Sequence, residues 1–184
     1  MRCSAATGSI RRTLPDADVS TVSRLDSFIR RMSAQRILLD RAGELIADIE
    51  GPVVDLGIGA GRTFDHLCSL FPDRDVFAFD NFVQAAVGFL PPPERMVIGD
   101  IRDTLPHALP RLSARAALVH NDLGSADAVG NAATAAWLAP AIEAVARPDA
   151  IVVTSFPIPF TAWESLPLPP GVKPGRYHLI RLTI

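Results

Sequence analysis

The stretch from Asp55 to Gly61 constrains the fold of this chain more than any other part of its sequence. It reads Asp-Leu-Gly-Ile-Gly-Ala-Gly and lies between a short apolar segment at residues 52–56 and a predicted helix at residues 63–70. Glycine allows a positive backbone φ and lets a ligand approach the main chain closely. The first N–H groups of a helix have no intrahelical partner and form an electropositive end. We therefore expect a strand, a tight turn and a helix that together hold a phosphate or a carboxylate.

The spacing of the three glycines narrows the choice of ligand. A dinucleotide-binding turn has its third glycine three residues after the second, and that position is Arg62. A phosphate-binding P-loop requires Gly-Lys followed by Ser or Thr, which this chain does not contain. The third glycine is instead Gly61, and an acid, Asp55, precedes the turn. By itself the turn is equally compatible with a purely structural role.

Strand-like and helix-like segments alternate along most of the chain, a pattern that predicts a parallel sheet covered by helices on both faces. The alternation ends in a proline-rich stretch, and two segments there predict an antiparallel hairpin. We therefore expect an α/β three-layer sandwich with a mostly parallel, doubly wound sheet and a C-terminal antiparallel hairpin. The expected strands are residues 52–56, 75–79, 95–98, 116–120, 150–155, 163–168 and 177–184, and the expected helices are residues 63–70, 83–89, 126–146 and a short one near Leu105.

The N-terminal part of the chain is expected to be organised separately from the rest. Residues 1–18 predict a flexible tail, residues 19–49 an N-terminal helical segment, and residues 50–184 one ligand-binding domain. Ser20 or Ser23 is the expected cap of the helical segment. Its apolar side chains recur at helical spacing, which predicts a face that packs on the sheet. These side chains are Leu38, Ala42, Leu45, Ile46 and Ile49.

Polar residues follow the expected strands at their carboxyl ends. Asp80 comes 19 residues after the last glycine of the turn, where a carboxylate accepts hydrogen bonds from two ribose hydroxyls. Asp100 follows the third strand and is placed to accept a hydrogen bond from an adenine amino group. His120, Asn121 and Asp122 end the fourth strand. Because ligands of open α/β sheets bind outside these carboxyl ends, we expect all of them to surround one site.

From about residue 50 to its C-terminus, the chain resembles the class I, Rossmann-like S-adenosylmethionine-dependent methyltransferases. The turn from Asp55 to Gly61 matches the first motif of that family at every defining position. Asp80 matches the ribose-binding acid of the family, and Asp100 matches its adenine-side acid. Asn121–Asp122 falls where the fourth motif borders the methyl group. The chain is also similar to a small uncharacterised bacterial subgroup of these enzymes, with a short N-terminal helical segment and Arg-Thr after the glycine turn.

The resemblance implies S-adenosylmethionine as the cofactor. The residues expected to bind it are Asp55, Gly57, Gly59, Gly61, Thr63, Asp80, Asn81, Asp100, Ile101 and Asn121. Asp55 is expected to act either through the geometry of the loop or by reaching the methionine amino group, and Thr63 to satisfy the free amides of the helix. In the resembling enzymes the segment before the turn often covers the pocket. Arg30, Arg31 and Gln35 are therefore expected either in such a lid or on solvated surface.

Two residues are candidates for a general base. Asp122 is the first and His120 the second, in case the acceptor must lose a proton. The alternative for Asn121 and Asp122 is a capped turn before a long helix, and the alternative for His120 is a structural position at a strand end. The sequence contains no evident cluster of metal ligands. We therefore expect metal-independent, in-line methyl transfer.

Some features of the sequence depart from the family pattern and limit the classes of methyl acceptor that we expect. Phe156-Pro157-Ile158-Pro159 stands where a helix normally follows the fifth strand. The fourth motif is not Asn-Pro-Pro-Tyr or Asp-Pro-Pro-Tyr, which argues against amino methylation of DNA bases or glutamine. The formal net charge is −2, whereas nucleic-acid binders usually carry a basic excess. We expect a small-molecule methyl acceptor and no nucleic-acid partner. The alternatives are a non-catalytic cofactor-binding or scaffold protein, and an RNA or protein methyltransferase that acts through an oligomer.

Composition also bears on location and assembly. No segment reaches the ~20 apolar residues of a membrane helix, and the first twenty residues lack an apolar signal core. The chain is therefore expected to be cytoplasmic, with no membrane partner. Apolar side chains in the proline-rich segment predict an exposed self-association surface and hence a homo-oligomer. These side chains are Phe156, Ile158, Phe160 and Trp163.

Overall fold

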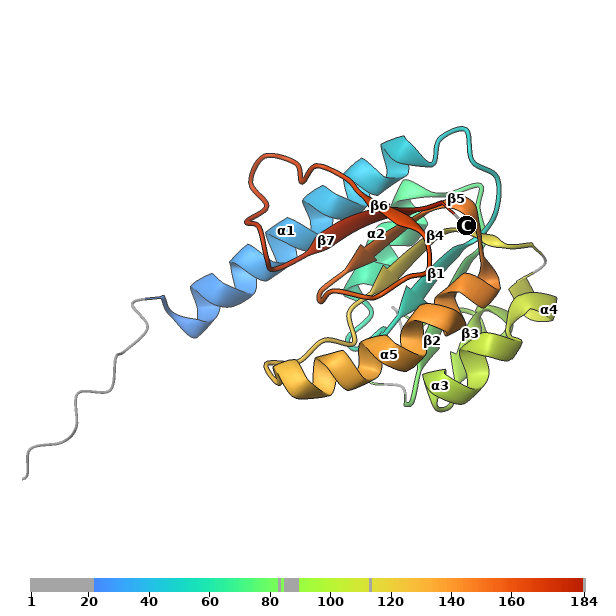
Figure 1. The fold of residues 1–184 in the computed structure, drawn as a ribbon. Helices are drawn as coiled ribbons and strands as arrows, with labels where there is room; N and C mark the ends of the chain where they lie inside the picture. Colours follow the sequence, from blue (N-terminus) through green and yellow to red (C-terminus); the bar gives the residue numbers. More distant parts are fainter. Residues whose placement is uncertain (1–21, 83, 85–89, 113, 184) are drawn as a thin grey trace, which may run out of the picture.

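The computed structural model describes residues 22–82, 84, 90–112 and 114–183. Its centre is a seven-stranded sheet with the order β3-β2-β1-β4-β5-β7-β6 (Figure 1). The strands from β3 to β5 pair in parallel, and β7 is antiparallel to both β5 and β6, as predicted. The strands are β1 (Val53–Leu56), β2 (Val76–Asp80), β3 (Met96–Ile98), β4 (Ala116–Asn121), β5 (Ala146–Thr154), β6 (Trp163–Ser165) and β7 (His178–Leu182).

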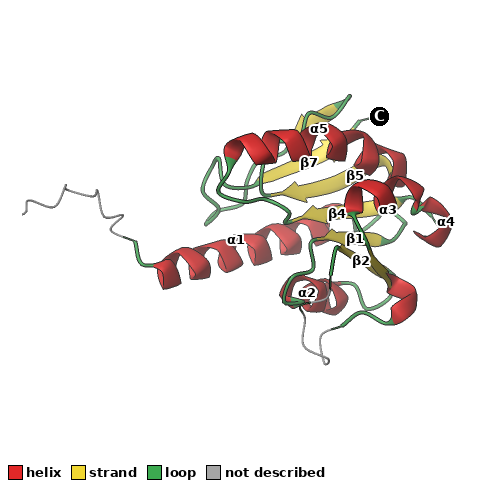
Figure 2. Cartoon of the chain, turned by 90° about the horizontal axis from the view of Figure 1, so that it is seen from below, coloured by secondary structure: helices red, strands yellow, loops and turns green. Residues whose placement is uncertain are grey.

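Helices cover both faces of the sheet and complete the predicted three layers (Figure 2). Helices α1 and α2 lie on one face, and α5 lies on the other face together with the short helices α3, η3 and α4. The helices are α1 (Arg24–Leu45), α2 (Arg62–Leu70), η2 (Pro93–Arg95), α3 (Ile101–Thr104), η3 (Leu105–His107), α4 (Leu109–Leu112) and α5 (Ala128–Val145). The single short helix expected near Leu105 is thus a run of three short helices.

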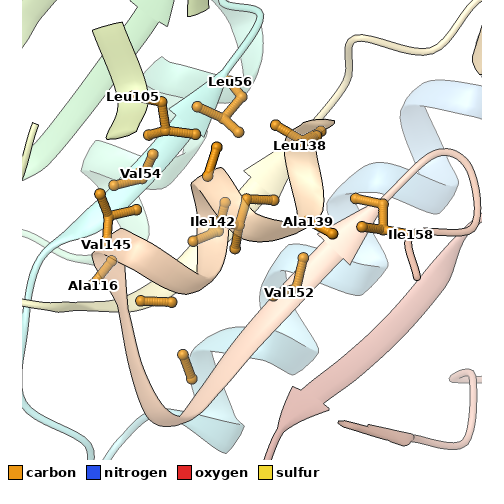
Figure 3. Packing of buried hydrophobic residues seen from close by; sticks show 14 of the residues in the cluster. Val54, Leu56, Leu105, Ala116, Leu138, Ala139, Ile142, Val145, Val152 and Ile158 are labelled. Carbon is orange, nitrogen blue, oxygen red and sulfur yellow. The ribbon is translucent and has the colours of Figure 1, made fainter. Parts of the chain in front are cut away.

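Two apolar clusters fill the spaces between the sheet and the two helical layers. Successive residues of a strand point to opposite faces. Val53 therefore packs in the cluster with Leu38 of α1, whereas Val54 packs in the cluster with Ile142 of α5 (Figure 3). All four side chains are 0% exposed. The middle of the sheet is therefore covered by apolar side chains on both faces.

Helix α1 begins one residue after Ser23, one of the two predicted caps. The Ser23 hydroxyl accepts a hydrogen bond from the backbone N–H of Asp26 at 3.0 Å. The predicted apolar face is confirmed at Leu38, Ala42 and Ile46, each 0% exposed. These residues anchor the C-terminal half of α1 over the sheet, while the other half extends past the sheet (Figure 1). The division of the chain near residues 18 and 49 stays a prediction.

The segment after β5 is not helical, as the proline pattern predicted. Residues 155–162 are all described and contain no helix. Phe156, Ile158 and Phe160 are only 4%, 3% and 6% exposed and pack in the cluster under α5. The prediction of an exposed apolar surface is wrong for these three residues, because they fill the space that a helix would otherwise cover. Among the four residues of that prediction, only Trp163 is exposed, at 46%.

Three other sequence predictions need comment. The tail expected at residues 1–18 lies outside the described residues, and so does the helix expected at residues 83–89 apart from residue 84, which is not helical. The strand expected at residues 163–168 ends at Ser165, although the Leu166 N–H still donates to the carbonyl of Leu179 at 2.8 Å. Pro167, which has no N–H, cannot continue this pairing. Among the described residues, no helix has the length and apolarity to cross a membrane.

Candidate functional site

The glycine turn connects β1 to α2 at the carboxyl edge of the sheet. Gly57, Gly59 and Gly61 have φ values of +87°, +49° and +81°, a region that glycine enters without strain. A Cβ atom at Gly57 would lie 3.0 Å from a methyl group of Leu123, so the close packing adds a second reason for glycine there. Gly61 is the N-cap of α2, and it makes no side-chain capping bond to the first N–H groups of the helix. These groups are available to a ligand.

Asp80, the last residue of β2, is tied to this turn. The Gly59 N–H donates a hydrogen bond of 3.0 Å to Oδ2 of Asp80. Two large apolar side chains beside Asp80 are exposed: Phe82 at 57%, and Ile98 at 58%, the residue that pairs with Asp80 in the sheet register. A carboxylate between exposed apolar surfaces suits a sugar that carries a flat base. Sequence reasoning missed Phe82 and Ile98, because only burial distinguishes them from core residues.

The other residues predicted at this end of the site are placed differently. Asp100 follows β3 and caps α3, and its Oδ1 accepts a hydrogen bond from the Arg102 N–H at 2.9 Å. Asn81 is exposed just after β2. Ile101 is 4% exposed and packs in the cluster under α5. Asp80, Asn81 and Asp100 therefore lie on neighbouring strand ends, while the Ile101 side chain belongs to the core.

Asp55 and His120 form a completely buried pair. They are direct neighbours in the register of β1 and β4. Asp55 Oδ1 lies 2.7 Å from His120 Nδ1, and its Oδ2 accepts a hydrogen bond of 3.2 Å from the Thr63 hydroxyl. Both side chains of the pair are 0% exposed. Since both oxygens of Asp55 bond within the protein, this carboxylate holds α2 and β4 around the turn.

The charge of His120 follows from this pairing. Burial lowers the pKa of His120, but the hydrogen bond to Asp55 and the charges of Asp55 and Asp122 outweigh burial. The pKa of His120 is therefore raised above its ordinary value. Its Nε2 atom is also buried and has no hydrogen-bond partner among the described residues.

We expect the free energy of unfolding to decrease as the pH rises above about 6.5, the pKa of histidine in an unfolded chain. The raised pKa means that folded His120 keeps a proton that the unfolded chain has lost, so its stabilising contribution is complete below that pH and disappears as the pH passes the folded pKa. Urea unfolding between about pH 6.5 and 8.5 measures this slope. In His120→Gln the free energy of unfolding should depend less steeply on pH. An unchanged slope in that variant contradicts the assignment of this effect to His120.

The three other described groups with a shifted pKa titrate outside this window. Burial lowers the pKa of His178, so its effect lies below the ordinary histidine pKa. The pKa of the Cys68 thiol is raised, mainly by burial, so its effect begins above 9.0. Burial raises the pKa of Tyr177, so its effect lies above the ordinary tyrosine pKa. Among the described groups with a shifted pKa, His120 is therefore the one expected to act between about pH 6.5 and 8.5.

The side chains of Asn121 and Asp122, at the end of β4, differ in burial and in their partners. The Asn121 side chain is 0% exposed; its amide donates to the Thr154 hydroxyl at 2.9 Å, and its oxygen accepts from the Leu123 N–H at 3.2 Å. Asn121 thus joins the ends of β4 and β5. The Asp122 side chain is 16% exposed and forms an ion pair of 3.7 Å with Arg31 of α1. Of the two side chains, Asp122 is the one with access to solvent.

A small pocket lies where α1 crosses the glycine turn. Its lining includes Gly57, Gly59, Asp122, Arg31 and Gln35. Gln35 is 2% exposed, and neither its amide nitrogen nor its oxygen has a hydrogen-bond partner among the described residues. The segment was expected either to cover the pocket or to lie on solvated surface. Gln35 therefore takes the covering position. The signal was present in the sequence, since Gln35 precedes Leu38, Leu39 and Ala42 on the same apolar helix face.

A larger cavity of ≈ 630 Å³, the edge cavity, adjoins this pocket through Arg31, which lines both. It lies between α1, the segments after β4 and β5, and the turn before β7. Its lining includes the side chains of Arg31, Ser155, Arg176 and Tyr177. Sequence reasoning missed Arg176 and Tyr177, because only the antiparallel pairing of β7 brings its start to the carboxyl edge. Within the described ranges, no group of three His, Cys, Asp or Glu side chains could hold a metal ion.

This chain is similar to known proteins in both sequence and structure. A family model described as S-adenosyl-L-methionine methyltransferase matches residues 22–182. A crystal structure of an S-adenosyl-L-methionine methyl transferase from Silicibacter pomeroyi DSS-3 is similar, with 40% identity, coverage of 87% of this chain and 98% of that chain, and a TM-score of 0.80. No curated protein matches the sequence significantly.

Two more distant structures share the fold. A TDP-rhamnose 3'-O-methyltransferase of calicheamicin biosynthesis has 17% identity and a TM-score of 0.57, over 90% of this chain and 88% of that chain. Human methyltransferase-like protein 13, solved in complex with SAH, has 13% identity and a TM-score of 0.53, over 85% of this chain and 82% of that chain.

Proposed function

Since this chain belongs to the S-adenosyl-L-methionine methyltransferase family, we propose that it transfers the methyl group of this cofactor to a small molecule. The observation that carries the proposal is that two neighbouring pockets share Arg31 as a lining residue. The glycine turn and Asp122 line one of them, the edge cavity is the other, and Arg31 lines both and pairs with Asp122. A volume of ≈ 630 Å³ suits a small acceptor.

The residues present fit the cofactor along the carboxyl edge. Asp80 is proposed to bind the ribose, with Asn81 and Asp100 toward the adenine and with Phe82 and Ile98 against its ring. The glycine turn and the free N–H groups of α2 are proposed to hold the methionine end. Asp55 and Thr63 support this arrangement through loop geometry, since their hydrogen bond lies inside the protein. Ile101 and Asn121 are proposed to act in the same indirect way.

The protein's contribution to the reaction is positioning and proton transfer. When bound, S-adenosylmethionine supplies a methyl group on a sulfonium, and the electrons of the broken bond stay with sulfur. Asp122 is proposed to take the proton that the acceptor loses. His120 remains the second candidate, but it has no exposed surface and its Nδ1 is held by Asp55. We propose that it positions Asp55. Holding the acceptor in line is worth up to ~7–11 kcal/mol of the barrier.

We expect Asp122→Asn to lower methyl transfer by about 10²- to 10⁴-fold, the usual contribution of a positioned base. The affinity for S-adenosylmethionine, measured by isothermal titration calorimetry, should stay within about threefold of the wild type, because the variant keeps the size of the side chain. Transfer is measured as tritium that moves from labelled cofactor into a small-molecule extract. An unchanged rate in Asp122→Asn would show that Asp122 is not the base that takes the proton of the acceptor.

The same assay separates the alternatives. Label in the small-molecule fraction supports the proposal, and label in RNA or protein that nuclease or protease treatment abolishes supports a macromolecular acceptor. Cofactor binding without transfer to any fraction supports a non-catalytic protein.

Transfer that survives EDTA supports a metal-independent reaction, which is our proposal. A cytoplasmic location and a homo-oligomeric state stay predictions; sedimentation at micromolar concentration measures the second.

A further inference from the structure

The lining of the edge cavity is unbalanced in charge. Two guanidinium groups, Arg31 and Arg176, line it, and no carboxylate does so. Arg31 already has a partner, since it pairs with Asp122 at 3.7 Å. Arg176 is exposed, and no ion pair joins it to any carboxylate in the described part of the chain. The cavity therefore presents a positive charge that no carboxylate of the described residues neutralises.

Hydroxyl groups of the same cavity add hydrogen-bond donors. The Ser155 Oγ atom is buried and has no hydrogen-bond partner among the described residues. Such a group loses its hydration without compensation unless a ligand or solvent bonds to it. Tyr177 is 2% exposed, and its pKa is raised by burial and by the charge of Asp122, so the phenol stays a neutral donor. Ser155 follows β5 and Tyr177 precedes β7, each next to the last pair of the register, Thr154 with His178.

We propose that the methyl acceptor carries an anionic group, a carboxylate or a phosphate, which Arg176 binds together with the hydroxyl groups of Ser155 and Tyr177. The inference rests on the proposed function, since it assigns a substrate class to the same site. An arginine is suited to both anions because its donors form a planar fork. An acceptor held at this end of the cavity extends toward Arg31, and so toward Asp122 and the glycine turn.

The test compares three probes that share one ring and differ in charge. They are 4-hydroxybenzoate, 4-hydroxyphenyl phosphate and the neutral 4-hydroxybenzamide. Each is titrated into the full-length protein loaded with S-adenosylhomocysteine, and binding is followed by calorimetry. We expect at least one anionic probe to bind about tenfold or more tightly than the amide, the range of a charge-assisted hydrogen bond. The comparison of carboxylate with phosphate identifies which anion the cavity prefers.

Variants assign the effect to the cavity. Arg176→Ala should abolish the preference for the anionic probe, and Ser155→Ala should reduce it by a few fold. Lys173→Ala is the matched control: it removes a positive charge from the same exposed segment, and Lys173 does not line the cavity. The preference should survive in this control. Arg176 is exposed, so its replacement is not expected to affect folding.

The failures of the two proposals are distinguishable. If S-adenosylhomocysteine binds but the amide binds as well as the anions, or no probe binds at ~10 mM, the anionic acceptor is rejected and the methyltransferase proposal stands. An anion preference that Arg176→Ala leaves intact, or that Lys173→Ala also abolishes, rejects the assignment to this cavity. If S-adenosylhomocysteine itself does not bind, the proposed function fails first, and the acceptor proposal fails with it.

Discussion

Asp80→Ala is expected to weaken binding of S-adenosylmethionine by about 10- to 100-fold, the loss that follows from removing one hydrogen bond of a charged group at about 1.5–3 kcal/mol. The carboxylate of Asp80 lies at the end of β2, where it already accepts the N–H of Gly59 at 3.0 Å. Its removal therefore takes away both the proposed partner of the ribose and a hydrogen bond to the glycine turn. Isothermal titration calorimetry measures the change.

Stability should change little in the same variant. Asp80 is half-buried, and the hydrogen bond from Gly59 lies in a partly solvated position, so water can replace the lost partner. Asp103→Ala is the control, because Asp103 is an exposed carboxylate on the neighbouring helix α3. A dissociation constant for Asp80→Ala within about threefold of the wild type would show that the ribose lies elsewhere.

Asp55→Ala is expected to have the largest effect on stability, a loss of about 3–5 kcal/mol in the free energy of unfolding. Removing one partner of a buried ion pair leaves the other charge without compensation, and here both side chains are 0% exposed. The variant also removes the acceptor for the Thr63 hydroxyl. Urea unfolding at about pH 6.5, where His120 carries its charge, measures the loss.

A loss of this size can prevent folding, so two further variants complete the experiment. Asp55→Asn keeps the volume and an acceptor for Thr63 but removes the charge, and it should lie between Asp55→Ala and the wild type. In His120→Gln the loss should be smaller at about pH 8.5 than at pH 6.5, because the imidazolium is what the pair stabilises. If Asp55→Ala lies within about 1 kcal/mol of the wild type, the buried pair is not an important source of stability.

Much of the site could be predicted because it depends on local backbone requirements. The three glycines of the turn have positive φ, and the acids Asp80 and Asp100 follow parallel strands whose carboxyl ends meet at one edge. Periodicity alone indicated the helix that contains Leu38 and Ala42. The same reasoning was wrong about Phe156, Ile158 and Phe160, since a count of apolar residues does not distinguish an exposed surface from a segment that replaces a helix.

The amino-acid sequence by itself determined the strand–turn–helix unit around Gly57 to Gly61, the alternation of the α/β fold and the family to which the chain belongs. These follow from backbone conformation and from the period of side-chain burial. The tertiary structure alone decided the Asp55–His120 pair, the ion pair between Arg31 and Asp122, and the position of Arg176. Asp55 and His120 are 65 residues apart in the chain. Such contacts depend on which strands become neighbours, and no local pattern encodes that order.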